Sequence, residues 1–484
     1  MRRPCASTRA RCRQVVALAL ATLGVSSPLA ADIHRYALNF ADDLQTVEVT
    51  AELARPGLAL TARNAERLDL IDIRTCQGER LRRGRSIQLA AQEACVRYQA
   101  RLTPADRNSG FAAALPSDVM MTSPSTWLWI PDLGVGDGVQ LEVTSATHIS
   151  APWQREAGRY RFGASPRSSR GLVLLGAFDA LVLEGIAMSK PVAYIGPEDA
   201  REKVKAWLIG ALGATNPGGE ICLPNPDMHV VVVDVGPRGR SPVPFGHVIR
   251  DQGETVRLFI DSTRSLEDFL YDWTAVHEFA HLRLPYVTGR QKWISEGFAS
   301  YYQNVLQARA GFYGEAEAWQ RLTRSFARAA ESGRDTSPNG TASEEFWRVR
   351  MMVYWSGAAL ALHADAELRE QSGGAKNLDS VLALLAECCL PSGEVWQGRR
   401  LFALLDELAE AEVFVPLFDR YADALGMPPT EELMASLGVV GQGERASLDD
   451  SARLAHIRRM ITAPHPCGAN SNANNNTNTG APYG

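Results

Sequence analysis

The segment HEFAH, residues 277–281, constrains this chain more than any other short stretch. Residues i and i+4 lie one above the other on a helix, so His277 and His281 can point their imidazoles at one ion only if the backbone is helical. Glu278 projects about 100° around the helix from His277. The spacing therefore predicts a helix with two metal-ligating histidines and an adjacent carboxylate. The alternative is an ordinary amphipathic helix whose histidines face the core.

A catalytic zinc site requires three protein ligands and one open position, so the helix alone is not sufficient. The best third ligand is Glu296 in WISEGFASYY, which opens the next predicted helix near Trp293. Fourteen residues separate His281 from Glu296. Two antiparallel helices joined by a short loop would bring these residues together, so we expect one Zn²⁺ per chain bound by His277, His281 and Glu296.

Two further residues are predicted to take part in chemistry. Glu278 is expected to act as the general base, taking a proton from the attacking water and passing it to the leaving amine. Tyr354 in VYWSGAALAL is a candidate for stabilising the oxyanion, because a phenol can donate a hydrogen bond to that oxygen. On spacing alone a tyrosine among apolar helix residues is more often part of the core.

At these residues the chain resembles the glycyl aminopeptidase family of gluzincin zinc metallopeptidases, and more distantly the alanyl aminopeptidases. The segments that carry the resemblance are HEFAH, WISEGFASYY and VYWSGAALALHADAELREQSGG. The resemblance implies a thermolysin-like catalytic domain, with His277, His281 and Glu296 as zinc ligands and Glu278 as the base. Tyr354 falls where these relatives place a tyrosine that stabilises the transition state.

The sequence departs from that family pattern in two places. Relatives usually carry a PDZ domain after the catalytic domain, and the residues that follow ELMASLGV are too few for one. Relatives also bind the free amine of the substrate through a glutamate in a Gly-rich motif. The corresponding stretch, PVPFGHVIRDQGE, has no glutamate at the expected place. Glu254 either substitutes for it or is a surface charge, and without such an anion endopeptidase activity becomes an alternative.

The predicted fold class is α+β. It comprises a β-sandwich-like N-terminal domain, then a thermolysin-like metallopeptidase domain with a mostly helical C-terminal part. Short alternating segments predict strands up to about residue 190, and GPEDAREKVKAWLIGALGA predicts the first long helix. Ser265 and Asp268 form a capping-box pattern that opens the helix carrying HEFAH, with Pro285 as its stop. ETVRLFID is either the edge strand along which a peptide lies or an ordinary strand.

Four segments follow from these patterns. Residues 1–31 predict a cleaved signal peptide, with basic residues before the apolar run VVALALATLGV and small residues after it. The β-rich domain is expected at 32–190 and the catalytic domain with its helical subdomain at 191–445. Residues 446–484 are expected to be a short extension with a disordered Asn-rich tail. We expect no stable membrane span after cleavage and a periplasmic or secreted protein.

Charge and cysteines limit the partners and the compartment. Removing residues 1–31 removes five arginines and no acid, which leaves 45 basic residues against 55 acidic ones. This balance argues against a nucleic-acid-binding surface. Six cysteines remain, and Cys76 with Cys95 is the predicted disulfide; the adjacent Cys388 and Cys389 could pair only with strain. The sequence does not define the oligomeric state.

The sequence therefore predicts an exported zinc metallopeptidase that hydrolyses peptide or protein substrates, with aminopeptidase-like action. The first alternative is a metallo-endopeptidase of the cell envelope. A second is a peptide-binding protein that kept the fold and lost catalysis, although a protein that only binds peptides has no need of Glu278. A zinc hydrolase acting on a non-peptide amide is a further alternative.

Overall fold

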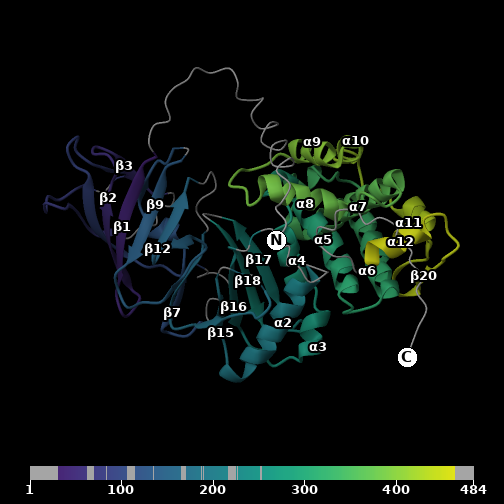
Figure 1. Ribbon diagram of the computed structural model, residues 1–484, viewed down its shortest axis with the longest axis horizontal. Coiled ribbons are helices and arrows are strands. Elements are labelled where there is room, and N and C mark those ends of the chain that lie inside the picture. The colour runs from purple at the N-terminus through teal and green to yellow at the C-terminus, as the bar shows by residue number, and fades with distance from the viewer. Residues whose placement is uncertain are drawn as a thin grey trace, which may run out of the picture.

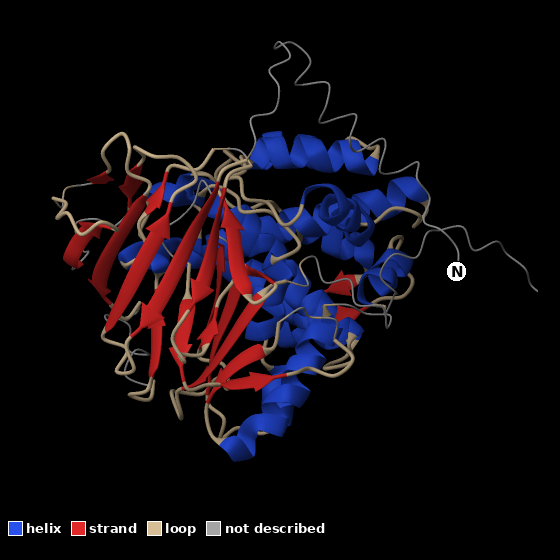
Figure 2. Ribbon diagram, turned by 60° about the vertical axis from the view of Figure 1, so that its left-hand side comes forward, coloured by secondary structure: helices blue, strands red, loops and turns tan. Residues whose placement is uncertain are grey.

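The structure is a computed structural model in which an N-terminal region of β-sheets lies beside a mostly helical remainder (Figure 1). Viewed from another side, the strands form one half of the molecule and the helices the other (Figure 2). This arrangement confirms the predicted α+β class. The structure describes residues 31–463 except 63–69, 83, 85, 106–114, 135, 165–170, 187, 189, 216–224, 226, 251 and 252.

The N-terminal region is built on a seven-stranded sheet with the order β11-β12-β9-β1-β2-β6-β4. Side chains alternate between buried and exposed along its strands, so each strand has one face in the core. The disulfide predicted between Cys76 and Cys95 is present beside this sheet. The strands are β1 (Ile33–Phe40), β2 (Thr46–Glu52), β4 (Leu70–Thr75), β6 (Cys95–Arg101), β9 (Gly138–Val143), β11 (Gln154–Glu156) and β12 (Arg159–Gly163).

Two three-stranded sheets complete the N-terminal region. Trp127 and Trp129 lie fully buried in the core of this region. Trp129 is fixed by hydrogen bonds at both backbone groups, since its N–H donates to Tyr98 and its carbonyl accepts from Tyr36. One sheet contains β3 (Ala59–Thr61), β5 (Ser86–Gln88) and β8 (Ile130–Pro131); the other contains β7 (Val119–Thr122), β10 (Ile149–Ser150) and β13 (Val173–Gly176).

A separate five-stranded sheet supports the helices, with the order β14-β15-β16-β18-β17. Its inner strands β16 and β18 are buried at every residue except Asp234, which explains the run of four valines in β16. β14 precedes the boundary predicted at residues 190–191. The strands are β14 (Asp179–Leu181), β15 (Val192–Ile195), β16 (His229–Asp234), β17 (Phe245–Arg250) and β18 (Glu254–Ile260). β18 lies between β16 and β17, so ETVRLFID is not the edge strand; β17 is.

After the five-stranded sheet the chain is mostly helical up to the last described residues. α4 and α5 are the helices predicted to carry HEFAH and Glu296, and α5 contacts the 27-residue α7. The helices are α2 (Arg201–Ala214), α3 (Leu266–Tyr271), α4 (Thr274–His281), α5 (Lys292–Arg309), α6 (Glu315–Ser332), α7 (Phe346–Ser372), α8 (Leu378–Cys389), α9 (Gly398–Ala409), α10 (Phe414–Tyr421), α11 (Glu431–Leu437) and α12 (Ala455–Thr462). Two short strands, β19 (Val439–Val440) and β20 (Ser447–Leu448), pair near α11. No helix in the described ranges is long and apolar enough to cross a membrane.

The helix predicted to run from Ser265 through HEFAH is in fact two helices. The capping box of Ser265 and Asp268 opens α3, as predicted. α3 ends at Asp272, whose backbone is extended and whose carboxylate accepts a hydrogen bond from the N–H of Thr274 at 2.8 Å. Asp272 therefore starts α4 anew, and this break gives the HEFAH helix its own direction.

Buried polar contacts join the N-terminal region to the five-stranded sheet. His229 of β16 lies 2.8 Å from the Ser150 hydroxyl of β10 and 3.2 Å from that of Thr255. The Lys190 ammonium donates to the carbonyls of Pro152 and Asp227, one from each region. Burial lowers the pKa of His229 to about 3, so this histidine is neutral in the folded protein.

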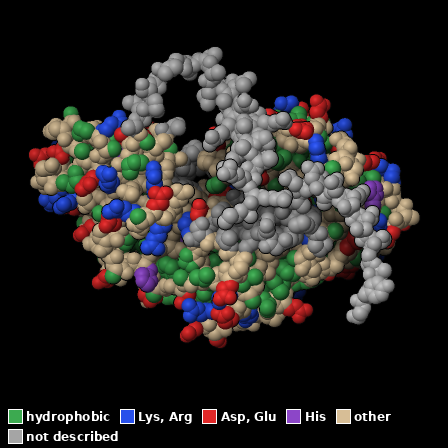
Figure 3. Space-filling model, in the orientation of Figure 1, with side chains coloured by type: hydrophobic (Ala, Val, Ile, Leu, Met, Phe, Trp, Pro, Cys, Tyr) green, Lys and Arg blue, Asp and Glu red, His purple; other side chains and the backbone are tan. Residues whose placement is uncertain are grey.

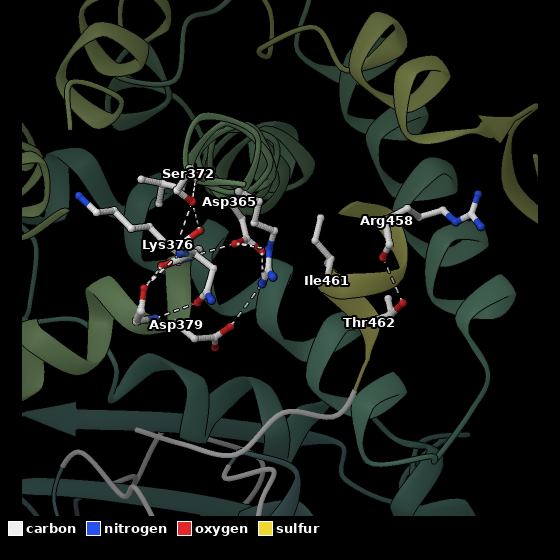
Figure 4. A network of polar contacts seen from close by, with 12 residues as sticks. Asp365, Ser372, Lys376, Asp379, Arg458, Ile461 and Thr462 are labelled. Atoms are coloured by element: carbon white, nitrogen blue, oxygen red, sulfur yellow. Dashed lines mark hydrogen bonds and ion pairs between the residues drawn. The ribbon is translucent and has the colours of Figure 1, made fainter. Parts of the chain in front are cut away.

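A second set of buried charges ties α5, α7 and α8 together, and we call it the arginine–aspartate cluster: Arg309, Asp365, Arg369 and Asp379. Figure 4 shows Asp365 and Asp379 near the start of α8. Asp365 accepts hydrogen bonds from Arg369 at 3.0 Å, from the Tyr301 hydroxyl at 2.7 Å and from a backbone N–H of α8. Asp379 pairs with Arg309 at 3.0 Å.

The structure also joins Cys388 to Cys389, a pairing that the sequence did not favour.

Candidate active site

His277, His281 and Glu296 converge in the interior between α4 and α5. Their ligand atoms all lie within 4.8 Å of one another. The Nε2 atoms of His277 and His281 are 3.3 and 3.5 Å from one carboxylate oxygen of Glu296. Ligand atoms of a tetrahedral zinc site, with bonds of about 2.0–2.2 Å, are roughly 3.3 Å apart. The donor set and its spacing therefore fit a metal ion of this size.

The other nitrogen of each imidazole is held by a polar side chain of α5. His277 Nδ1 lies 2.8 Å from Gln303 Oε1, and His281 Nδ1 lies 3.1 Å from Ser295 Oγ. Such contacts orient the rings and leave both Nε2 atoms directed at Glu296. The sequence reasoning did not find these two residues. A signal was present, because Gln303 follows Glu296 by seven positions and so lies two turns along the same helix face.

Glu278 lies under the edge strand β17. The backbone N–H of Val248 donates a hydrogen bond to its carboxylate. Gly246 is so close that a Cβ there would come within 2.7 Å of Glu278 Cγ. Burial raises the pKa of Glu278 to about 7, in the range that suits a general base. The charges of His277 and Glu296 act on the pKa in opposite directions and do not cancel the effect of burial.

The pKa values of Glu296 and His281 favour the ionised carboxylate and the neutral imidazole, which are the forms that bind a cation. Burial raises the pKa of Glu296, but the charges and hydrogen bonds of His281 and His277 more than reverse that effect, so the carboxylate is ionised. Burial also lowers the pKa of His281 to about 4. For His277, burial lowers the pKa while Glu296 and Glu278 raise it, and the net change is upward.

Tyr354 comes from α7 and stands over the same site. Its ring stacks on that of His277, with centroids 5.7 Å apart and planes 28° apart. Burial, and secondarily the negative charges of Glu296 and Glu278, raise the pKa of its phenol, which therefore stays protonated and able to donate. The structure thus places Tyr354 beside His277 and the other proposed metal ligands. Its role in the chemistry stays a prediction.

Two glycines set the distance between α5 and α7. A Cβ on Gly297, the residue after Glu296, would come within 2.2 Å of the Cα of Gly357. A Cβ on Gly357 would come within 2.2 Å of the Trp293 carbonyl. The backbones of α5 and α7 are therefore in contact at this point. This contact brings Tyr354 of α7 close to His277, His281 and Glu296.

Glu254, the predicted substitute for an amine-binding glutamate, lies at the other end of the β17–β18 hairpin. One of its oxygens accepts from Arg250 Nε and the other from Asn225 Nδ2, both at 3.0 Å. Arg250 also donates to the backbone carbonyls of His281 and Leu284 at the end of α4. These residues border a cavity of about 290 Å³ between the N-terminal region, β17–β18 and the segment 391–393. Glu254 is therefore a paired, buried acid.

The fold and the metal-binding group define a class, the metallopeptidases, and the comparisons agree with it. Residues 285–359 match the family model described as M61 glycyl aminopeptidase, which confirms the resemblance predicted from the sequence. The matched segment contains Glu296 and Tyr354. A comparison with curated proteins gives no match.

Solved structures share the fold at low sequence identity. An aminopeptidase N family protein from Idiomarina loihiensis has a TM-score of 0.57 and 14% identity, covering 84% of this chain and 78% of that one. Yeast LTA4 hydrolase in complex with bestatin has a TM-score of 0.50 and 12% identity, covering 90% of this chain and 74% of that one. These likenesses extend the match from one segment to the architecture of both regions.

Proposed function

We propose that the chain is an exported zinc metallopeptidase that hydrolyses peptide bonds in an aminopeptidase-like manner. The observation that carries the proposal is the convergence of His277, His281 and Glu296, with Glu278 buried directly beside them. A structural role for two histidines does not explain a second buried carboxylate at the same place, since buried acids are costly unless they are used or paired.

Each residue of the site has a distinct part in the reaction. When bound to His277, His281 and Glu296, zinc supplies a Lewis acid that polarises a peptide carbonyl and acidifies water. Glu278 takes the proton from the attacking water and delivers it to the leaving amine. The Tyr354 phenol donates a hydrogen bond to the oxyanion that develops on the former carbonyl oxygen.

The edge strand β17 supports a peptide substrate. Its outer edge pairs with no strand of the described ranges, so its backbone groups can add an extended peptide to the sheet. Gly246 and Val248 of this strand contact Glu278, which places such a peptide beside the base.

On the described part of the face in Figure 3, acidic and basic side chains are interspersed, which is not the single-sign surface of a nucleic-acid-binding protein.

Endopeptidase activity is the second candidate, and the pairing of Glu254 favours it. An aminopeptidase needs an anion to hold the substrate's terminal ammonium. Both oxygens of Glu254 are engaged by Arg250 and Asn225, so this residue is not a free anchor. A protein that accepts internal peptide segments needs no such anchor.

Glu278→Gln tests the reaction and a peptide library tests the substrate. The variant should retain one zinc per chain and lose turnover by a factor of about 10²–10⁴. Retained activity would remove Glu278 from the role of base. The library is presented with free N-termini and again N-acetylated. Cleavage of the free set alone supports aminopeptidase action, and equal cleavage of both sets supports the endopeptidase.

A periplasmic or secreted location is part of the proposal. The signal-like pattern of residues 1–31 and the disulfide between Cys76 and Cys95 support it, because disulfides persist in oxidising compartments. Residues 1–30 and the Asn-rich tail lie outside the described residues. N-terminal sequencing of the exported protein would test cleavage after residue 31.

A further inference from the structure

The cavity beside Glu254 lies at the end of the strand that is proposed to support a peptide. Gly246 and Val248 of β17 lie against Glu278, and Arg250 is the last residue of the same strand. A strand rises about 3.3 Å per residue, so Arg250 lies roughly 7 Å beyond Val248. An extended peptide paired with β17 would therefore pass the cavity two or three residues from the bond that is cleaved beside Glu278.

Three parts of the molecule form the walls of this cavity. The N-terminal region contributes Pro152 and Phe162, the β17–β18 hairpin contributes Arg250 and Glu254, and the segment before α9 contributes residues 391–393. The cavity of about 290 Å³ is at the lower end of the range for small-molecule sites, about 300–1,000 Å³. The space suits one side chain or a short piece of backbone.

Arg250 has one nitrogen that the protein does not use. Only 7% of its side chain is exposed. Nε donates to Glu254, and Nη2 donates to the carbonyls of His281 and Leu284 at the end of α4. Nη1 forms no hydrogen bond with any residue that the structure describes, and Arg250 borders the cavity. Because a buried donor without a partner is costly, a group in the cavity that accepts a hydrogen bond from Nη1 is favoured.

The ionic groups that border the cavity are balanced by opposite charges. Arg250 and Glu254 form a buried ion pair at 3.0 Å. Arg161 lies 3.8 Å from an acid, and Asp227 acts electrostatically on the buried ammonium of Lys190. A ligand charge of either sign would be buried beside a pair that is already neutral, which is costly. A neutral group with a carbonyl oxygen avoids this cost and still provides a partner for Arg250.

We propose that this cavity binds a neutral amide of the substrate, two or three residues from the cleaved bond, with Arg250 Nη1 donating to the amide oxygen and Glu254 accepting from the amide nitrogen. The inference rests on the proposed peptidase function and names what its substrate carries. Each oxygen of Glu254 accepts one hydrogen bond from the protein, and a carboxylate oxygen can accept a second. The amide belongs either to an Asn or Gln side chain or to the substrate backbone.

The first test compares peptides of a sequence that the wild-type protein is shown to cleave. At the positions two and three residues from the cut, on both sides, the residue is Gln, Glu, Lys or norleucine. We expect kcat/KM for Gln to exceed that for the other three by at least about tenfold at one position, because a site built around hydrogen bonds rejects analogues that lack them. Gln and Glu have the same shape, so their comparison isolates the charge.

A second set of peptides tests the backbone as the source of the amide. In each peptide an ester replaces one backbone amide at the same positions. If the backbone is recognised, one ester should lower kcat/KM by at least about tenfold while the four side chains are cleaved equally.

Variants then assign the preference to the cavity. Glu254→Gln leaves the charge of Arg250 without its partner, so a preference for a Gln side chain over Glu should shift toward Glu by at least about tenfold. Glu142→Gln is the matched control, because it removes the acid from an exposed pair with Arg159, also at 3.0 Å, and should leave the preference intact. Zinc content is measured for each protein, because Arg250 holds the end of the helix that carries His281.

Gly393→Phe tests the cavity without touching the buried pair. Gly393 borders the cavity, and a Cβ there meets no other atom within 4 Å, so the chain should tolerate the larger side chain. The variant narrows the space and should remove most of either preference, for the side chain or for the backbone amide. It decides the question if Glu254→Gln does not fold.

The outcomes separate this inference from the proposed function. If neither the side chains nor the esters change kcat/KM, or if Gly393→Phe leaves the preference as it was, amide recognition is rejected and the peptidase stands. A Glu-to-Gln ratio that Glu254→Gln and Glu142→Gln leave equal rejects a side-chain amide in this cavity. If the zinc-loaded wild-type protein cleaves no peptide, the proposed function fails, and the inference fails with it.

Discussion

Two groups of buried charges lie on α5 and the helices around it, and they differ in how their charges are balanced. The arginine–aspartate cluster contains two acids and two arginines in close ion pairs, and a third arginine, Arg283, lies 3.7 Å from Asp379. The metal-binding group contains Glu296 and Glu278 with two imidazoles, and Lys292 touches it only from the rim. The first group is complete without a ligand and holds α5, α7 and α8 together. The second has two buried carboxylates and a single paired cation at its rim, which fits the metal ion that we propose it binds.

Among variants that separate the two groups of charges, Glu296→Ala should have the largest effect on metal retention and activity. Loss of one of three ligands should abolish metal retention and with it all measurable peptidase activity. The fold should persist, because the arginine–aspartate cluster is untouched. Zinc stoichiometry, activity and thermal unfolding are measured on the same sample. Unchanged zinc content would remove Glu296 from the ligand set.

Arg369→Met should do the reverse and damage the fold. It leaves Asp365 as a buried acid without its closest base, at an expected cost of about 3–5 kcal/mol in the free energy of unfolding. Protein that remains folded should bind zinc normally. Denaturant unfolding measures the cost. Arg399→Met, which removes an exposed pair with Asp419, is the control expected to leave stability almost unchanged. Equal effects of the two variants would contradict a structural role for the cluster.

Tyr354→Phe sharpens the comparison within the metal site, because it removes a donor and not a ligand. We expect kcat to fall by about 10²–10³, as for loss of one oxyanion donor, with zinc content unchanged. The ring still stacks on His277, so the stability should hardly change. Steady-state kinetics with metal analysis tests this, and an unaffected kcat would return Tyr354 to the core.

His229 offers a smaller test, since it is buried among hydroxyls and not carboxylates. Its pKa is about 3 in the folded state and about 6.5 when unfolded, so the unfolded state binds the proton first. Stability is therefore complete above pH 6.5 and falls as the pH drops toward 3. Between pH 6.5 and 5 the loss should be about 2 kcal/mol. In His229→Asn this part of the acid dependence should disappear, as denaturant titrations at both pH values can show; an unchanged slope would exclude His229 as its source.

The sequence predicted what depends on spacing along one helix or across one short loop. HEFAH and Glu296 are of this kind, and so is the capping box at Ser265. It did not predict which strand lies at the sheet edge, because β17 takes that place by pairing with β18 in the folded sheet. Nor did it predict the orienting roles of Gln303 and Ser295, which depend on how α5 is rotated against α4.

Gly297 and Gly357 lie in contact because neither has a side chain. Their small size therefore sets the distance between α5, which carries Glu296, and α7, which carries Tyr354. Every group that touches the substrate could stay the same while Gly297→Ala moved α7 outward. The Tyr354 phenol would then lie too far from the oxyanion to donate a hydrogen bond, although the metal ion would stay bound. In the proposed mechanism, one added carbon at Gly297 would therefore lower the rate, although Gly297 itself takes no part in the chemistry.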